Sequence, residues 1–185
     1  MDKRMIIAVA AGLMLLASCG TKTDTEKTTD TVCLSETPSN PPSVWPKGEP
    51  NDAYAQYFTG QSYLALLDST SGLCNVTFEP GCRNNWHIHH GATQMLICVS
   101  GRGWYQEWGK PAVELRPGVV IAVPEGVKHW HGAAADSWMQ HLTYHANTQP
   151  GNSNEWLEPV DDKQYGELKE NPFPQYGKNL CQPKS

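Results

Sequence analysis

Apolar and polar residues alternate in short runs through the middle of the chain, and this pattern predicts β-strands. Successive side chains of a strand point to opposite faces, so a period of two places the apolar set on one buried face. Glycine or proline separates the runs at intervals of roughly 6 to 12 residues, which is typical of an antiparallel sandwich or barrel. We therefore predict an all-β domain over residues 51–150, with strands at 61–67, 73–79, 86–90, 94–100, 103–108, 112–115, 119–123, 129–133 and 138–145.

The first 18 residues have the pattern of an export signal rather than of the domain. Three charged or polar residues precede an apolar run at 5–17, which is too short to span a bilayer but suits a signal segment. The following Ser18-Cys19 completes a sequence that resembles a bacterial lipoprotein box. We expect cleavage before Cys19, lipidation of Cys19, and an exported protein held on the periplasmic or surface side of the envelope by this anchor alone. The alternative is an ordinary secretory signal that contains a cysteine.

Polar, proline-rich sequence lies on both sides of the predicted domain. Residues 19–50 are rich in threonine and proline, which predicts a solvated, irregular tether. A short helix or turn is expected just after it, from Asn51. Residues 151–185 form a C-terminal extension that we expect to pack on the barrel through Trp156 and Leu157, with one short helix over residues 162–170.

Charge and cysteine content limit the range of possible functions. The chain has 14 Lys and Arg against 19 Asp and Glu, and it lacks the basic stripe that nucleic-acid binding needs, so we exclude that class. With Cys19 assigned to lipid, five cysteines remain, an odd number for an oxidising compartment. Their spacing does not assign disulfide pairs among Cys33, Cys74, Cys82, Cys98 and Cys181.

Residues 81–101 carry the most informative chemistry. His87 and His89 are two residues apart on a predicted strand, so both imidazoles point to one face, and Gln94 follows five residues later. A third imidazole comes from His129 or His131. Imidazole nitrogens and a side-chain oxygen are suitable ligands for a divalent transition metal.

The same residues resemble the two motifs of the cupin superfamily. Gly81, His87, His89, Gln94 and Gly101 match the spacing of the first motif, and the second is matched by Gly118, Pro124, Gly126 and His129. Gln94 replaces the usual glutamate of the first motif, and Ala133 stands where asparagine is frequent in the second. The resemblance implies a double-stranded β-helix, or jelly-roll, barrel with irregular N- and C-terminal extensions.

Within the cupins, the chain is most similar to small single-domain members related to carboxymuconolactone-decarboxylase-associated cupins. Some members of that group are manganese-dependent hydroxynitrile lyases. This resemblance implies that His87, His89, Gln94 and His129 are metal ligands, and that His131 and His141 line the substrate pocket. It favours manganese, although iron, nickel and zinc accept the same ligands. His90 and His145 are expected to be peripheral.

A neutral glutamine in place of glutamate affects the expected chemistry. Three imidazoles and a carboxamide leave the charge of the metal uncompensated, which makes it a stronger Lewis acid. We therefore predict a lyase-like enzyme for a small hydroxy or carbonyl compound, in which His141, assisted by His131, moves a proton. A non-catalytic ligand-binding lipoprotein and an iron-dependent dioxygenase are the alternatives.

Seven tryptophans are many for a chain of 185 residues. Trp130 and Ile88 alternate with the candidate ligands and so point away from them. They are candidates for a homodimer contact, since aromatic residues are enriched at interfaces and related cupins commonly pair. Ordinary core packing is the alternative.

Overall fold

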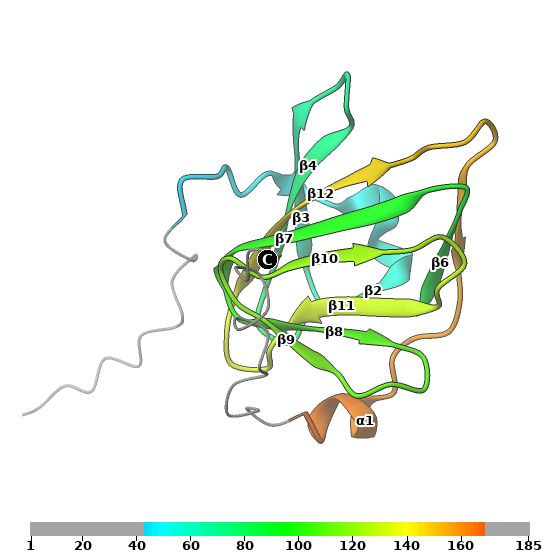
Figure 1. Ribbon diagram of the computed structural model, residues 1–185. Helices are drawn as coiled ribbons and strands as arrows, with labels where there is room; N and C mark the ends of the chain where they lie inside the picture. Colours follow the sequence, from blue (N-terminus) through cyan, green and yellow to red (C-terminus); the bar gives the residue numbers. More distant parts are fainter. Residues whose placement is uncertain (1–42, 169–185) are drawn as a thin grey trace, which may run out of the picture. The chain divides into compact units, whose positions relative to one another are not determined.

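Two antiparallel sheets form the fold, with most of the core between them (Figure 1). The computed structural model describes residues 43–168. The first sheet has the strand order β1-β3-β4-β12-β7-β10. Its strands are β1 (Glu49–Pro50), β3 (Ser62–Asp68), β4 (Leu73–Phe78), β12 (Met139–Ala146), β7 (Thr93–Gly101) and β10 (Val120–Val123).

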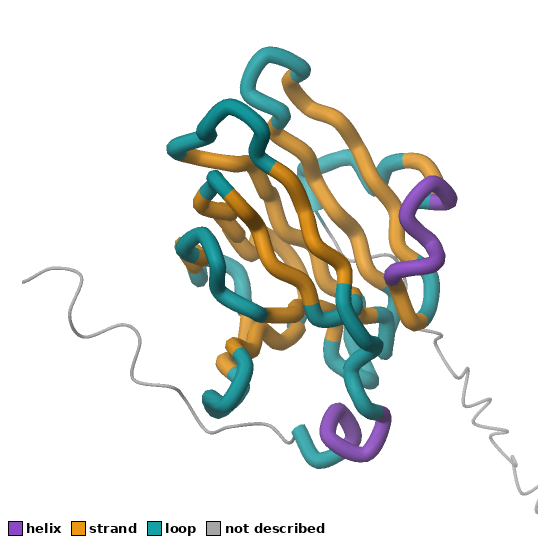
Figure 2. Tube along the Cα trace, turned by 90° about the vertical axis from the view of Figure 1, so that its right-hand side faces the viewer, coloured by secondary structure: helices purple, strands orange, loops and turns teal. Residues whose placement is uncertain are grey.

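The second sheet carries the strands that hold the histidines. Its path is β13-β6-β11-β5-β2, and β8 pairs with β11 and β9. The tube in Figure 2 shows the strands of the two layers and the short helical segments outside them. The bounds in this sheet are β13 (Ser153–Trp156), β6 (His87–His90), β11 (His129–Ala133), β5 (Arg83–Asn84), β2 (Phe58–Thr59), β8 (Gly103–Glu107) and β9 (Val113–Leu115). The all-β prediction is confirmed, and each of the nine predicted strands is present within one or two residues of its predicted ends.

The apolar core follows the alternation seen in the sequence. Along β7, Gln94, Leu96, Cys98 and Ser100 are buried while the residues between them are partly exposed. Leu96 and Cys98 pack with residues of both sheets, including Phe78 and Tyr105. Because Gln94 belongs to the same inward-facing set, the pleat that buries Leu96 also points the amide of Gln94 into the interior.

Residues 43–50, directly before the domain, are more regular than predicted. Irregular structure was expected up to Pro50, but β1 pairs with β3. Polar side chains of β4 hold the preceding backbone: Asn75 Nδ2 donates to the carbonyl oxygen of Pro46 (2.8 Å), and Thr77 Oγ1 donates to that of Lys47 (2.9 Å). These hydrogen bonds satisfy backbone groups that a proline-rich pattern alone would leave to solvent.

The C-terminal extension also contains a strand that the pattern did not predict. Residues 153–156 form β13, which pairs antiparallel with β6. Without β13, β6 would present unpaired backbone groups at the edge of the sheet. After it comes the short helix α1 (Asp162–Gly166), whose N-cap residue Asp161 accepts a hydrogen bond from the backbone N of Gln164.

A tryptophan cluster lies on the other side of β11 from the histidines. Trp86, Trp104 and Trp130 pack with Val160 and Tyr165 of the C-terminal segment. The hydroxyl of Tyr165 donates to the carbonyl oxygen of Ala133 (2.7 Å). Trp130 is fully buried by the chain itself, so its proposed place at a dimer contact is wrong and ordinary core packing holds. The homodimer stays a prediction.

Several predictions concern residues outside the described part. The signal segment, Cys19, Cys33 and Cys181 lie there. Among residues 43–168, Cys74, Cys82 and Cys98 are free thiols. Within the same range, none of the helical segments has the length and apolar character needed to cross a bilayer.

Candidate metal centre and cavity

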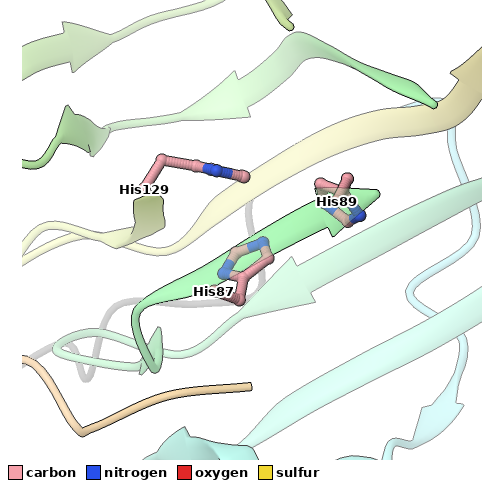
Figure 3. A group of neighbouring side chains, drawn as sticks. All are labelled: His87, His89 and His129. Carbon is pink, nitrogen blue, oxygen red and sulfur yellow. The ribbon is translucent and has the colours of Figure 1, made fainter. Parts of the chain in front are cut away.

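Three buried imidazoles converge between neighbouring strands. His87 and His89 lie on β6, and His129 lies on β11 directly opposite His87 in the strand register. One ring nitrogen from each residue lies within 4.8 Å of the other two. Figure 3 shows the three rings gathered at this point. This spacing allows one ion to be bound by all three residues, since ligand atoms about 2 Å from a metal lie about 3 to 4 Å from one another.

Hydrogen bonds fix which nitrogen of each ring is available. The Nδ1 of His87 lies 3.0 Å from the carbonyl oxygen of Asn85, and that of His129 lies 2.9 Å from the carbonyl oxygen of Val127. The Nδ1 of His89 lies 2.6 Å from Oδ1 of Asn154. Each partner is an acceptor, so each Nδ1 carries the proton. In a neutral imidazole this leaves Nε2 with a free lone pair, which is the form that ligates a metal.

Burial keeps these three rings neutral. Burial, with a smaller contribution from neighbouring imidazoles, lowers the pKa of His87 well below 6.5 and that of His129 to about 4. Burial also lowers the pKa of His89. A histidine with protons on both ring nitrogens has no lone pair and cannot bind a metal. Low pKa values, which keep one nitrogen bare, therefore favour metal binding at neutral pH.

Gln94 completes the candidate ligand set. Its Oε1 lies 3.0 Å from Nε2 of His129, so two groups that both present lone pairs face each other once Nδ1 of His129 is protonated. A cation between them removes this repulsion. If the oxygen and nitrogen of the Gln94 amide exchanged places, the amide nitrogen could donate to Nε2 of His129. Nε2 of His89 would still be buried without a hydrogen-bond partner. The residues present therefore fit a metal ion.

A second pair of imidazoles lies beside this centre. The rings of His131 and His141 are 4.9 Å apart and nearly perpendicular. Both are buried, and neither Nδ1 of His131 nor Nε2 of His141 has a hydrogen-bond partner. Burial lowers the pKa of His141 to about 4 and that of His131 well below 6.5, the latter with a contribution from His141. Both rings are neutral at pH 7.

A cavity of about 210 Å³ joins the two groups of histidines. Aromatic residues form part of its wall, among them Phe58, Phe78 and Trp156. His145 also lines it and lies 4.7 Å from the ring of His89, so the expectation that His145 is peripheral is wrong. His90 points outward and pairs with Glu155.

Known proteins are similar to this chain in sequence and in fold. The cupin domain family matches residues 74–143. The chain is 44% identical over 91 residues to an (R)-mandelonitrile lyase from Granulicella tundricola, covering 49% of this chain and 68% of the relative. The chain belongs to the cupin superfamily. A crystal structure of a cupin-like protein from Thermotoga maritima shares 35% identity and a TM-score of 0.60, covering 66% of this cupin and 93% of that protein.

Some residues of the site were missed by sequence reasoning. Asn154 on β13 holds His89, and Trp156 lies 4.8 Å from the ring of His87 and stacks on Tyr57 at 4.6 Å. Both lie outside the stretch that matches the cupin family. The presence of Trp156-Leu157 did suggest docking of this segment, but no motif connected Asn154 with a histidine 65 residues earlier.

This cupin is expected to bind one divalent transition metal ion per chain through the converging imidazoles. Replacing His129 with alanine removes one ligand and should weaken binding by at least about 100-fold, more than the usual effect of losing a supporting residue. Elemental analysis and competition titration with a chelator measure this. His90→Ala, an exposed histidine on the same sheet, is the control and should bind like the parent. Equal metal affinity in His129→Ala would contradict the assignment.

The metal-free protein is expected to lose stability as the pH falls from about 6.5 to about 4. Unfolded His141 takes up a proton near pH 6.5, whereas in the folded protein its pKa is about 4. The unfolded chain therefore binds more protons in this window, and the free energy of unfolding falls by roughly 2 kcal/mol between pH 7 and pH 5 from His141 alone.

Urea unfolding of parent and His141→Leu at both pH values tests this. The variant should lose about 2 kcal/mol less than the parent over the same interval, while His90→Leu should behave like the parent. An equal loss in parent and His141→Leu would show that His141 is not kept neutral by the fold.

Proposed function

We propose that this cupin is a metal-dependent lyase that cleaves a carbon–carbon bond in a small hydroxy compound, or forms it in reverse. One observation carries the proposal: a buried pair of neutral imidazoles shares a cavity with a set of residues suited to a metal. The 44% identity to an (R)-mandelonitrile lyase supports this reaction class.

His87, His89, Gln94 and His129 are the residues that would hold the ion. All four donors are neutral, so the bound ion would supply uncompensated positive charge that stabilises negative charge developing on a substrate oxygen. We propose manganese as the metal. Iron, nickel and zinc fit the same ligands.

His141 is the proposed general base. Its Nδ1 lies 3.3 Å from the carbonyl oxygen of Leu142 and so carries the proton, which leaves the lone pair on Nε2. That nitrogen would take the proton of the substrate hydroxyl while the carbon–carbon bond breaks and a carbonyl forms. The electron pair of the broken bond leaves with the departing carbon, which then receives the proton.

The cavity favours a small substrate with an aromatic group. Its volume is about 210 Å³, and the rings of Tyr54, Phe58, Phe78 and Trp156 line it. Apolar rings bury an aromatic substituent, while the histidines satisfy one polar centre. An aromatic 2-hydroxynitrile has this combination of groups.

Replacing His141 with alanine should lower kcat/KM for an aromatic 2-hydroxynitrile by about 10²- to 10⁴-fold, the usual contribution of a general base. Metal content should not change, because His141 is not one of the converging ligands. Formation of the aromatic aldehyde by metal-loaded protein can be followed by ultraviolet absorbance, with His90→Ala as the control. Unchanged turnover with the metal retained would remove His141 from the mechanism.

The same assay separates the two alternatives. Tight binding of hydroxynitriles with no product over long incubation would identify a ligand-binding protein rather than an enzyme. Turnover that stops when oxygen is removed would identify a dioxygenase. Gln94 argues against the latter, because iron oxygenases of this type ordinarily use two histidines and a carboxylate.

We also propose that this cupin acts at the cell envelope as a lipoprotein. The support is the apolar run at residues 5–17, which ends in Leu16-Ala17 and is followed directly by Ser18-Cys19. In a bacterial host the protein should fractionate with membranes and carry lipid on Cys19 by mass spectrometry. Cys19→Ser should abolish lipidation. A parent protein without lipid, released in soluble form, would contradict the proposal.

A further inference from the structure

Asn84 contacts His131 twice from the neighbouring strand. Asn84 lies on β5, which pairs with β11, and it is 3% exposed. Its Oδ1 accepts a hydrogen bond from the backbone N of His131 (2.9 Å), and its Nδ2 lies 3.0 Å from Nε2 of the His131 ring. The first contact joins two strands, while the second reaches a side chain that lines the cavity.

The backbone contact determines how the amide is oriented. A backbone N–H can only donate, so the atom of Asn84 that faces it must be the oxygen. The amide nitrogen therefore faces the ring of His131 and donates to it. Nε2 of His131 must then be the bare nitrogen, and the proton of the neutral ring is on Nδ1.

His141 has the opposite arrangement in the cavity. Its Nδ1 is directed to the carbonyl oxygen of Leu142 at 3.3 Å, so its unpartnered Nε2 carries a lone pair. The unpartnered atom of His131 is Nδ1, which carries a proton. Two imidazoles 4.9 Å apart thus present one hydrogen-bond donor and one acceptor, although their side chains are chemically identical.

We propose that Asn84 is a positioning residue that fixes His131 as a donor, so that His131 and His141 together select a substrate hydroxyl. A hydroxyl can accept from Nδ1 of His131 and donate to Nε2 of His141, whereas a carbonyl oxygen can only accept. The hydroxyl proton is then already directed at the base that removes it. This assignment of substrate class rests on the proposed lyase function; the state of the His131 ring does not.

The variant Asn84→Asp tests the assignment with little change in size. One carboxylate oxygen can still accept from the backbone N of His131. The other oxygen now faces Nε2 and can only accept, so the proton of the neutral ring should move from Nδ1 to Nε2. Nitrogen-15 NMR of the histidine rings reads this directly, because protonated and bare ring nitrogens have well-separated signals.

The measurement uses the full-length, zinc-loaded protein, since zinc is diamagnetic. The His131 signals are identified by their loss in His131→Gln. The parent should show His131 with the proton on Nδ1 and a bare Nε2, and Asn84→Asp should show a bare Nδ1 and a protonated Nε2. Asn152→Asp makes the same charge change on an exposed turn and should match the parent. A protonated Nε2 in the parent, or a bare Nε2 in Asn84→Asp, would overturn the proposal.

Turnover by manganese-loaded samples of the same variants separates this proposal from the proposed function. Asn84→Asp should lower kcat for a 2-hydroxynitrile by about 10-fold or more with unchanged metal content, because the donor to the hydroxyl is lost. If the parent has the predicted ring state but no lyase activity, the lyase function fails and the role of Asn84 in setting the tautomer stands. If the parent is active and Asn84→Asp matches it in kcat, the role of Asn84 in substrate positioning fails alone.

Discussion

Hydrogen bonds on the outer side of three imidazoles set the chemistry of this cupin. The oxygens of Asn85, Val127 and Asn154 each accept the proton of one ring, so the three inner nitrogens keep their lone pairs and point together. Two of the acceptors are backbone carbonyls two residues before the histidine that they hold. The strand geometry itself therefore sets the ring states of His87 and His129, while His89 depends on a side chain from another strand.

The sequence predicted those parts of the fold and site that depend on local spacing. The strands follow a period of two, and the same period places His87 and His89 on one face and turns Gln94 inward with Leu96. The pairing of His129 with His87 was accessible only through the resemblance of both motifs to the cupins. Spacing along one strand gives no information about which residue of another strand lies opposite.

The missed features are all long-range contacts. β13 forms from polar sequence because β6 offers it an edge, and nothing in Ser153–Trp156 alone indicates a strand. Trp130 could not be assigned to the core or to an interface from its face alone, since the deciding contact comes from the C-terminal segment. The role of Asn84 could not be predicted either. Its strand has only two residues, too few to show an alternating pattern, and its partner His131 lies 47 residues away.

Buried polar atoms without hydrogen-bond partners lower the stability of the fold around the cavity. Six buried side-chain atoms have no hydrogen-bond partner among the described residues, and three of them are the ring nitrogens of His89, His131 and His141. Each such atom ordinarily destabilises a fold by about 1 to 3 kcal/mol. The concentration of the three histidine nitrogens around one cavity is what a fold tolerates where a ligand, rather than the protein, supplies the missing partner.

The place of Asn154 in the chain makes the ligand set depend on the order of synthesis. All three imidazoles and the glutamine precede it, yet the acceptor that sets the ring of His89 arrives 65 residues later on the added strand. A nascent or truncated chain ending before residue 153 would contain every ligand and still leave the tautomer of His89 unfixed. Binding of the proposed ion would thereby be coupled to the pairing of β13 with β6, and a fragment that ends before residue 153 would hold the ion less firmly than a chain that contains β13.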